Sequence, residues 1–155
     1  MNPRETIERS RDVVRGLGRI GIEKTLQALD GAANIAIEAG FRHLQVHAAH
    51  GYLFSLLIDH RFNSLAPHVV SWLTEWAARQ STAGIETSIR ISLRTGDDEF
   101  DKNGRNYFHA QVANLPFDFV DVSSGFYNID KRLIYPARPD ILRTRRTETI
   151  ALANR

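Results

Sequence analysis

Hydrophobic residues recur along this chain with two different periods. From Glu23 to Ala39 the apolar side chains fall every three to four positions, which predicts a helix, and Gly40 stands where a helix would end in a left-handed cap. From His43 to His47 the period shortens to two, with Leu44 and Val46 alternating against polar residues. This second pattern predicts a strand with one apolar and one polar face.

The same alternation of periods continues towards the end of the chain. Further strands are predicted at Glu86 to Ser92 and at Phe117 to Ser123. Further helices are predicted at Tyr52 to Ile58, Ala66 to Arg79, Asn103 to Asn114 and Pro139 to Ala153. Strands that alternate with helices in this way indicate consecutive βα units, and therefore a parallel sheet in an α/β fold.

Composition narrows the expected chemistry and location. The 155 residues are 43% hydrophobic and 25% charged, as in a soluble domain, and a net charge of +2 does not favour nucleic acid or an anionic membrane. The absence of cysteine excludes disulfides and thiolate sites, so any redox chemistry would belong to a bound organic cofactor. Because Met1 to Arg19 has no signal-like apolar run and no stretch is long enough to span a membrane, we expect a cytoplasmic protein.

Reactive side chains gather where the predicted strands end. They are His47 and His50 after the first strand, Arg90, Ser92 and Arg94 in the second, and Ser123 and Ser124 after the third. The carboxyl ends of parallel strands share one edge of the sheet, and ligands bind at that edge in α/β proteins. We therefore expect these side chains to form one site.

Some of these residues allow a second interpretation. His47 and His50 can converge on one oxygen or one metal ion, but they can also simply satisfy backbone groups at a strand end. A metal site needs a third ligand, and no candidate stands at a diagnostic spacing, so no metal is predicted. Arg90 can instead be the buried ion-pair partner of Asp121 on the neighbouring strand.

Four segments of the sequence occur in an order seen in a known family. They are Ala39-Gly40-Phe41, His47-Ala48-Ala49-His50-Gly51-Tyr52-Leu53, Ile89-Arg90-Ile91-Ser92 and Val122-Ser123-Ser124-Gly125. In this order they resemble the middle of the barrel of the Old Yellow Enzyme family of NADH:flavin oxidoreductases. The segment from His47 to Leu53 is the most specific, and the resemblance covers Gly21 to Arg155.

The resemblance implies a fold and an activity. The fold would be α/β, an incomplete TIM-type (βα) barrel of about three to four βα units, because a complete barrel takes about 250 residues. Residues 21–155 would form this partial barrel domain and residues 1–20 a polar N-terminal extension. The activity would use FMN, reduced by NAD(P)H, to deliver hydride to the β-carbon of an activated alkene conjugated to a carbonyl.

The resemblance also implies a role for each candidate residue. His47 and His50 would bind the substrate carbonyl oxygen and stabilise the developing enolate. Tyr52 would donate the proton to the α-carbon as the catalytic acid. Arg90 would lie near the N1 and O2 edge of the flavin, and Ser123 and Ser124 would line the same cofactor-binding rim.

The remaining strands of such a barrel have no counterpart in this sequence. Three parallel strands would leave two free edges and an apolar inner face, which monomers rarely tolerate. We therefore expect a homo-oligomer or a complementary barrel subunit, and the apolar segment Phe126 to Pro136 is a candidate contact surface. The alternative function is a catalytically inert, truncated homologue that acts as a partner or assembly subunit.

Overall fold

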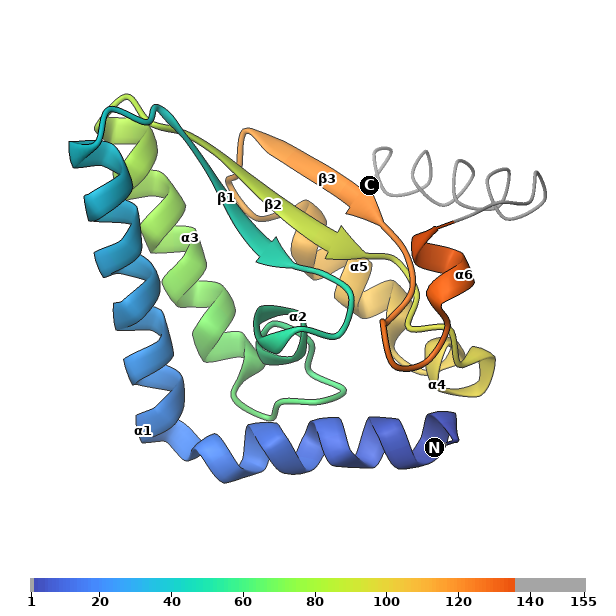
Figure 1. Cartoon of the computed structure of the whole chain (residues 1–155). Coiled ribbons are helices and arrows are strands. Elements are labelled where there is room, and N and C mark those ends of the chain that lie inside the picture. Colours follow the sequence, from blue (N-terminus) through green and yellow to red (C-terminus); the bar gives the residue numbers. More distant parts are fainter. Residues whose placement is uncertain (1, 136–155) are drawn as a thin grey trace.

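Within residues 2–135, three parallel strands form the sheet at the centre of the fold (Figure 1). A computed structural model describes residues 2–135 of the chain. The strands are β1 (His43–Ala48), β2 (Glu86–Ser92) and β3 (Phe119–Ser123), in the order β1-β2-β3 with both pairs parallel. The predicted α/β fold with a parallel sheet is therefore confirmed, and β2 has the predicted bounds.

Helices connect and flank these strands. Within residues 2–135 they are α1 (Pro3–Glu38), α2 (Leu53–Leu57), α3 (Ala66–Thr82), α4 (Asp98–Lys102), α5 (Arg105–Ala113) and α6 (Lys131–Ile134). The helix predicted at residues 139–153 lies outside the described residues. None of the helices in the described part of the chain is both long and apolar enough to cross a membrane.

Helix α1 has two halves that run in different directions (Figure 1). The break is at Gly18, whose φ of 57° and ψ of −175° are not helical. Residues 3–17, which we call the N-terminal arm, belong to the stretch expected to be a polar extension, yet they are helical and bury Ile7 and Val14 in the core. The second half of α1 contains the predicted helix.

One face of the sheet forms the hydrophobic core. Ile89 and Ile91 of β2 are fully buried, and α3 contributes Leu73 and Trp76 to the same cluster. Each such side chain contributes about 1.5 to 3 kcal/mol when it is removed from water. The apolar side of the alternating strand pattern therefore packs under the helices.

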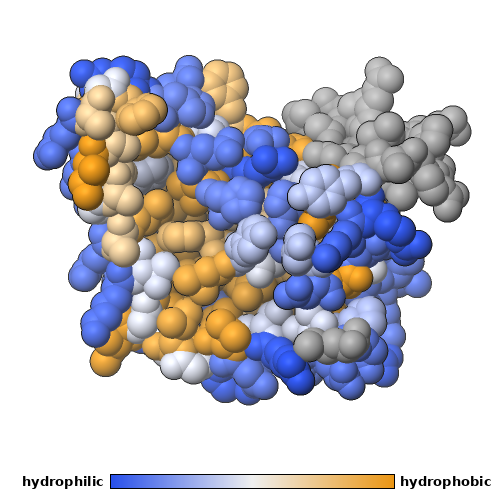
Figure 2. All heavy atoms as spheres, in the orientation of Figure 1, coloured by the Kyte–Doolittle hydropathy of each residue, from blue (hydrophilic) through white to orange (hydrophobic). Residues whose placement is uncertain are grey.

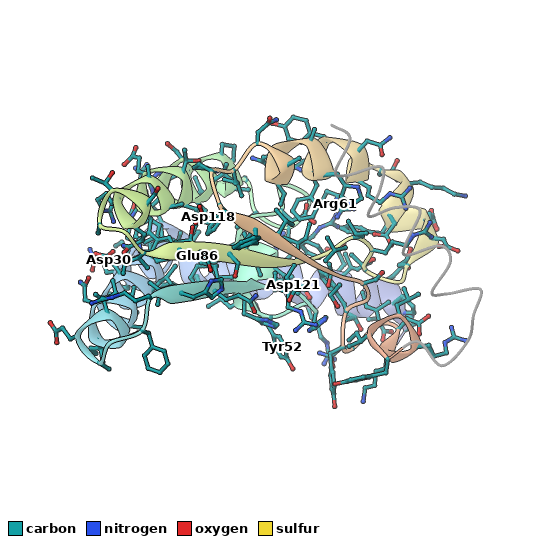
Figure 3. The ribbon with its side chains drawn as sticks, turned by 90° about the horizontal axis from the view of Figure 1, so that it is seen from above. Asp30, Tyr52, Arg61, Glu86, Asp118 and Asp121 are labelled. Atoms are coloured by element: carbon teal, nitrogen blue, oxygen red, sulfur yellow. The ribbon has the colours of Figure 1, made fainter. Side chains whose placement is uncertain are left out.

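The other face of the sheet is polar and open to solvent. His43, Gln45 and His47 of β1 are exposed on it. In Figure 3, Asp121 and Tyr52 lie on the opposite side of the sheet from α3 and α5. The expectation of an apolar inner face was wrong for most of this face, because nearly all the residues that alternate with the core positions are polar. His43, for example, contacts Ser88 on the neighbouring strand (Nε2 to Oγ, 3.0 Å). The exception is Phe119 of β3, which is paired with Ser88 and is 54% exposed.

The exposed apolar surface lies beside the sheet instead. Figure 2 shows apolar side chains gathered on the side of the molecule where α1 and β1 lie. Ile20 and Ile35 of α1 are 73% and 69% exposed, and Phe41, just before β1, is 63% exposed. In the described part of the predicted contact segment, Phe126 is only 5% exposed, whereas Tyr127 and Tyr135 are 42% and 71% exposed.

A buried ion-pair network joins the loops that follow β1 and β2. The Arg61 guanidinium binds the Asp59 carboxylate (Nη2 to Oδ2, 2.6 Å) and lies 3.6 Å from Asp101, and all three side chains are at most 8% exposed. Asp101 in turn accepts hydrogen bonds from the backbone N–H groups of Thr95 and Gly96. Both loops are thereby held against each other at the carboxyl ends of the strands.

Candidate active site at the carboxyl ends of the strands

A row of three polar residues crosses the open face. His47 of β1 is paired in register with Arg90 of β2, and Arg90 is paired with Asp121 of β3. Residues at paired positions of parallel strands project from the same face of a sheet. The row therefore places an imidazole, a guanidinium and a carboxylate side by side near the carboxyl ends of the strands.

The rings of His47, His50 and Tyr52 form a cluster at the end of β1. The centroid distances are 5.4 Å between the two histidines, 5.6 Å between His47 and Tyr52, and 6.4 Å between His50 and Tyr52. Tyr52 is 51% exposed, and His47 is also exposed. Two imidazoles and a phenol are thus presented together to solvent.

The backbone at His50 is held in an unusual conformation by neighbouring loops. Its φ is +62°, in the left-handed region that non-glycine residues seldom adopt. The His50 N–H donates to Ser92 Oγ (2.9 Å), and the Ser92 hydroxyl donates to the carbonyl of Gly125 (3.1 Å). The His50 carbonyl accepts from Tyr127 N–H (2.9 Å). Residues that follow β2 and β3 therefore fix the turn that follows β1.

The imidazole of His50 is also bonded to another strand. Its Nε2 lies 2.6 Å from Ser123 Oγ, and Ser123, at the end of β3, is 1% exposed. Ser124 is 3% exposed. The two serines are therefore buried beneath the cluster, and the Ser123 hydroxyl contacts a histidine of the same site.

Arg90 pairs with Asp121 across neighbouring strands. Arg90 Nε lies 3.4 Å from Asp121 Oδ2, so the ion-pair interpretation of Arg90 is confirmed. The two side chains are 35% and 42% exposed, so the pair is not buried as that interpretation assumed. Arg90 Nε itself is shielded from solvent and has no hydrogen-bond partner among the described residues. The guanidinium therefore keeps a donor for which nothing in the described chain is aligned.

The surroundings of His47 favour its neutral form. Partial burial, followed by the positive charge of Arg90, lowers the pKa of His47 below its usual value, while Asp121 acts in the opposite direction. A neutral imidazole carries one N–H donor and one acceptor nitrogen. At neutral pH His47 can therefore donate one hydrogen bond to a ligand oxygen.

The structure brings together most of the predicted site residues. His47, His50, Tyr52 and Ser123 are joined by direct contacts, and Arg90 stands in register with His47. The sequence did not indicate the roles of Ser92 and Tyr127, which hold the His50 backbone. Alternation along the strand places Ser92 in the site, but nothing local to Tyr127 signals its contact.

Cavities in the described part of the chain lie away from this cluster, and one of about 390 Å³ is lined by residues of α3 and α5. Two others, of about 290 Å³ and about 350 Å³, are lined by the N-terminal arm, the first together with residues around α4 and the second with residues 60–65. Their arginines are engaged with the chain itself, as Arg4 is with Glu99 and Arg11 with the carbonyl of Arg61. The candidate site is thus a patch on the open face of the sheet and not one of these cavities.

Among residues 2–135 there is no group of three or more histidine, aspartate or glutamate side chains placed to hold a metal ion. No protein-family model matches the sequence, and no curated protein matches it.

Proposed function

We propose that this chain contributes the substrate-binding wall of an FMN-dependent ene-reductase of the Old Yellow Enzyme type. The observation that carries the proposal is the cluster of His47, His50 and Tyr52 at the carboxyl end of a parallel strand. Two imidazoles can hold one carbonyl oxygen while a nearby phenol supplies a proton. The substrate class is a small molecule with a C=C bond conjugated to a carbonyl.

We propose further that the sheet is part of a (βα) barrel. Helices α3 and α5 lie on one side of the sheet and mostly polar residues line the other, and both outer strands, β1 and β3, have one unpaired edge within the described residues. In this proposal the remaining strands come from other copies of the chain or from a complementary subunit. Flavin chemistry would then require the assembled barrel.

The residues present fit an anionic flavin edge in part. Arg90 is a cation on the open face with its side chain 35% exposed, although its Nε lies 3.4 Å from Asp121. The flavin, once reduced by NAD(P)H, would supply the hydride. Arg90 would hold its pyrimidine edge, while Ser123 and Ser124, which are buried, have less access to it.

This chain's own residues would bind and protonate the substrate. His47, kept neutral by burial and by Arg90, donates a hydrogen bond to the carbonyl oxygen, and the His50 ring shares that oxygen. Charge that develops on the oxygen is thereby stabilised in the transition state. Tyr52, half exposed beside both rings, donates its phenolic proton to the α-carbon.

The alternative is a catalytically inert partner or assembly subunit. It is favoured by the internal pairing of two site residues, because Arg90 is engaged with Asp121 and the His50 ring with Ser123. A chain whose polar side chains find partners within it needs no ligand to remain folded. In that case the histidine cluster would persist without flavin chemistry.

Flavin retention separates the two functions. The natively expressed particle is passed through size exclusion with light scattering, while absorbance at about 450 nm reports oxidised flavin. A particle larger than one chain with stoichiometric FMN, able to oxidise NAD(P)H in the presence of 2-cyclohexenone, supports the enzyme. Arg90→Gln is the matched variant, and it should lose flavin if Arg90 holds the cofactor.

The opposite outcome is equally informative. A colourless particle of any size that rejects added FMN contradicts the flavin proposal and supports the inert subunit. A flavin-bound monomer contradicts the need for an assembled barrel and leaves the enzyme proposal standing.

A further inference from the structure

The side chain of His50 is anchored from a strand other than its own. Ser123, the last residue of β3, places its Oγ 2.6 Å from His50 Nε2 although 73 residues separate the two in sequence. The serine is 1% exposed. Water therefore cannot easily compete for this contact, and a hydrogen bond in such surroundings is stronger than one in water.

The backbone of the same histidine is anchored independently. Its N–H is bound by Ser92 Oγ and its carbonyl by Tyr127 N–H, each at 2.9 Å. Gly51, the next residue, has the Phe126 ring 2.9 Å from the position a Cβ would occupy, so the turn has no room to move in that direction. With the backbone fixed in this way, the orientation of the imidazole depends mainly on what its ring contacts.

We propose that Ser123 is a positioning residue that sets the orientation of the His50 ring, in contrast to the flavin-contacting role that the resemblance implies for it. The consequence for catalysis rests on the proposed function: a ring already oriented needs no ordering when the carbonyl oxygen binds. Loss of the hydrogen bond between Ser123 and His50, worth about 1.4 kcal/mol, should weaken binding of the carbonyl ligand about tenfold.

The orientation can be measured without any cofactor. In the ¹⁵N,¹³C-labelled full chain, three-bond couplings across the Cα–Cβ bond of His50 report whether its side chain occupies one rotamer. We expect one rotamer in the wild type and in Ser123→Thr, which keeps a hydroxyl, and averaged couplings in Ser123→Ala. Ser124→Ala, altered at the adjacent buried serine, is the matched control and should leave the His50 couplings unchanged.

The flavin-loaded particle supplies the second measurement. Ser123→Ala should raise the KM for the enone about tenfold and leave the FMN content unchanged. A direct flavin contact predicts the reverse, namely FMN loss with an unaltered His50 ring.

The two hypotheses fail in different ways. An averaged His50 side chain in the wild type, or a single rotamer retained in Ser123→Ala, overturns the positioning role whether or not flavin binds. A particle that never binds flavin contradicts the proposed function, while the rotamer measurement still decides the role of Ser123. If Ser123→Ala does not fold, the wild-type couplings and the Ser123→Thr variant still test the inference.

Discussion

At the scale of single residues, the row across the sheet places a cation next to the His47 imidazole and an anion one strand further away. Arg90 and Asp121 are in register with it, so their charges act on His47 from fixed distances. Arg90 lowers the pKa of His47 and Asp121 raises it, with partial burial as the largest cause of the net decrease. The hydrogen-bonding state of His47 is therefore set by residues of two other strands.

Substitutions in this row should move the pKa of His47 in opposite directions. Arg90→Gln removes the positive neighbour and should raise it, whereas Asp121→Asn removes the negative neighbour and should lower it further. NMR titration of the histidine ring resonances measures both shifts. Equal shifts of the same sign in the two variants would show that structural rearrangement, and not the charge of the neighbours, controls the pKa of His47.

Tyr52→Phe tests the assignment of the proton donor. The phenolic hydroxyl is removed while the ring, half exposed beside His47, is kept. In the proposed flavin-bound particle, reduction of the flavin by NAD(P)H should continue at its wild-type rate, and reoxidation by the enone should slow by about 10²-fold to 10⁴-fold. Stopped-flow absorbance separates the two half-reactions. Loss of both together would contradict the role of Tyr52.

Gly51 should tolerate a side chain poorly. It has a φ of +79°, and an alanine Cβ would lie 2.9 Å from the Phe126 ring. Gly84 has a similar φ of +72° with nothing within 4 Å, so Gly84→Ala measures the backbone strain alone. We expect Gly84→Ala to cost about 1 kcal/mol and Gly51→Ala about 1 to 3 kcal/mol more in the free energy of unfolding. Urea denaturation compares them, and equal losses would mean that Phe126 moves away freely.

At the scale of elements, the loops at the carboxyl ends of the strands are held by the Asp59, Arg61 and Asp101 network. Arg61 also lies against the Phe100 ring, with its guanidinium carbon 4.8 Å from the ring centroid. A charge that is this well buried is tolerated because two carboxylates and an aromatic face surround it. The network ties the segment after α2 to α4 and so keeps both loops clear of the open face.

Removal of the central charge should destabilise the fold strongly. Arg61→Leu leaves two buried carboxylates, each 2% exposed, without their cation, and should cost about 3 to 5 kcal/mol. Arg4→Leu breaks a pair with Glu99 whose side chains are 77% and 74% exposed, so solvent screens the pair and the free energy of unfolding should hardly change. Chemical denaturation of both variants checks the contrast. Similar losses would show that the buried carboxylates become protonated at little cost.

The pattern of the sequence predicted the strands better than the short helices. Strand β2 was predicted residue for residue, because its alternation spans all seven positions. Strand β3 begins two residues later than predicted, since Asp118 uses its carboxylate to accept the Thr87 N–H and so precedes the ladder. The N-terminal arm was missed because only Thr6, Ile7 and Val14 are buried in it, too few to produce a clear helical period.

The site was predicted as a set of residues but not as a set of contacts. His47, His50 and Arg90 lie close together because the carboxyl ends of all strands in a parallel sheet lie at the same edge. The bond between His50 and Ser123 depends on the left-handed turn at His50, and that turn is fixed by Ser92 and Tyr127. Such long-range loop contacts leave no periodic signal in the sequence.

At the scale of the whole molecule, the two surfaces next to β1 differ in character. The open face of the sheet is mostly polar, with Phe119 as an exposed apolar side chain, whereas α1 beside it exposes Ile20 and Ile35. The polar face can remain in water without a cover, because its side chains hydrogen-bond to each other, as His43 does with Glu86 and Ser88. The apolar surface that an isolated chain exposes to water therefore lies mainly on α1, and the sheet adds Phe119.

Folding stability should depend on the protonation of His47 at acidic pH. Its pKa is lower in the folded chain than in the unfolded chain, where it is about 6.5, so the unfolded state takes up the proton first. The contribution of neutral His47 to the free energy of unfolding is fully present above about pH 6.5. It is lost as the pH falls through the pKa of His47 in the folded chain. The stability of the wild type should therefore decrease relative to His47→Gln below about pH 6.5, as urea midpoints measured between about pH 5 and 8 will show. A constant difference would contradict the lowered pKa.

The order and direction of the strands also restrict how this sheet can grow. Its two outer strands are different, and all three strands run the same way. A two-fold axis that joined two β1 edges would reverse either the strand direction or the face of the added sheet. Only contact between the β3 edge of one copy and the β1 edge of the next preserves both. Any extension that keeps the polar face continuous is therefore head-to-tail, and it ends only by closing into a ring or by meeting a different chain.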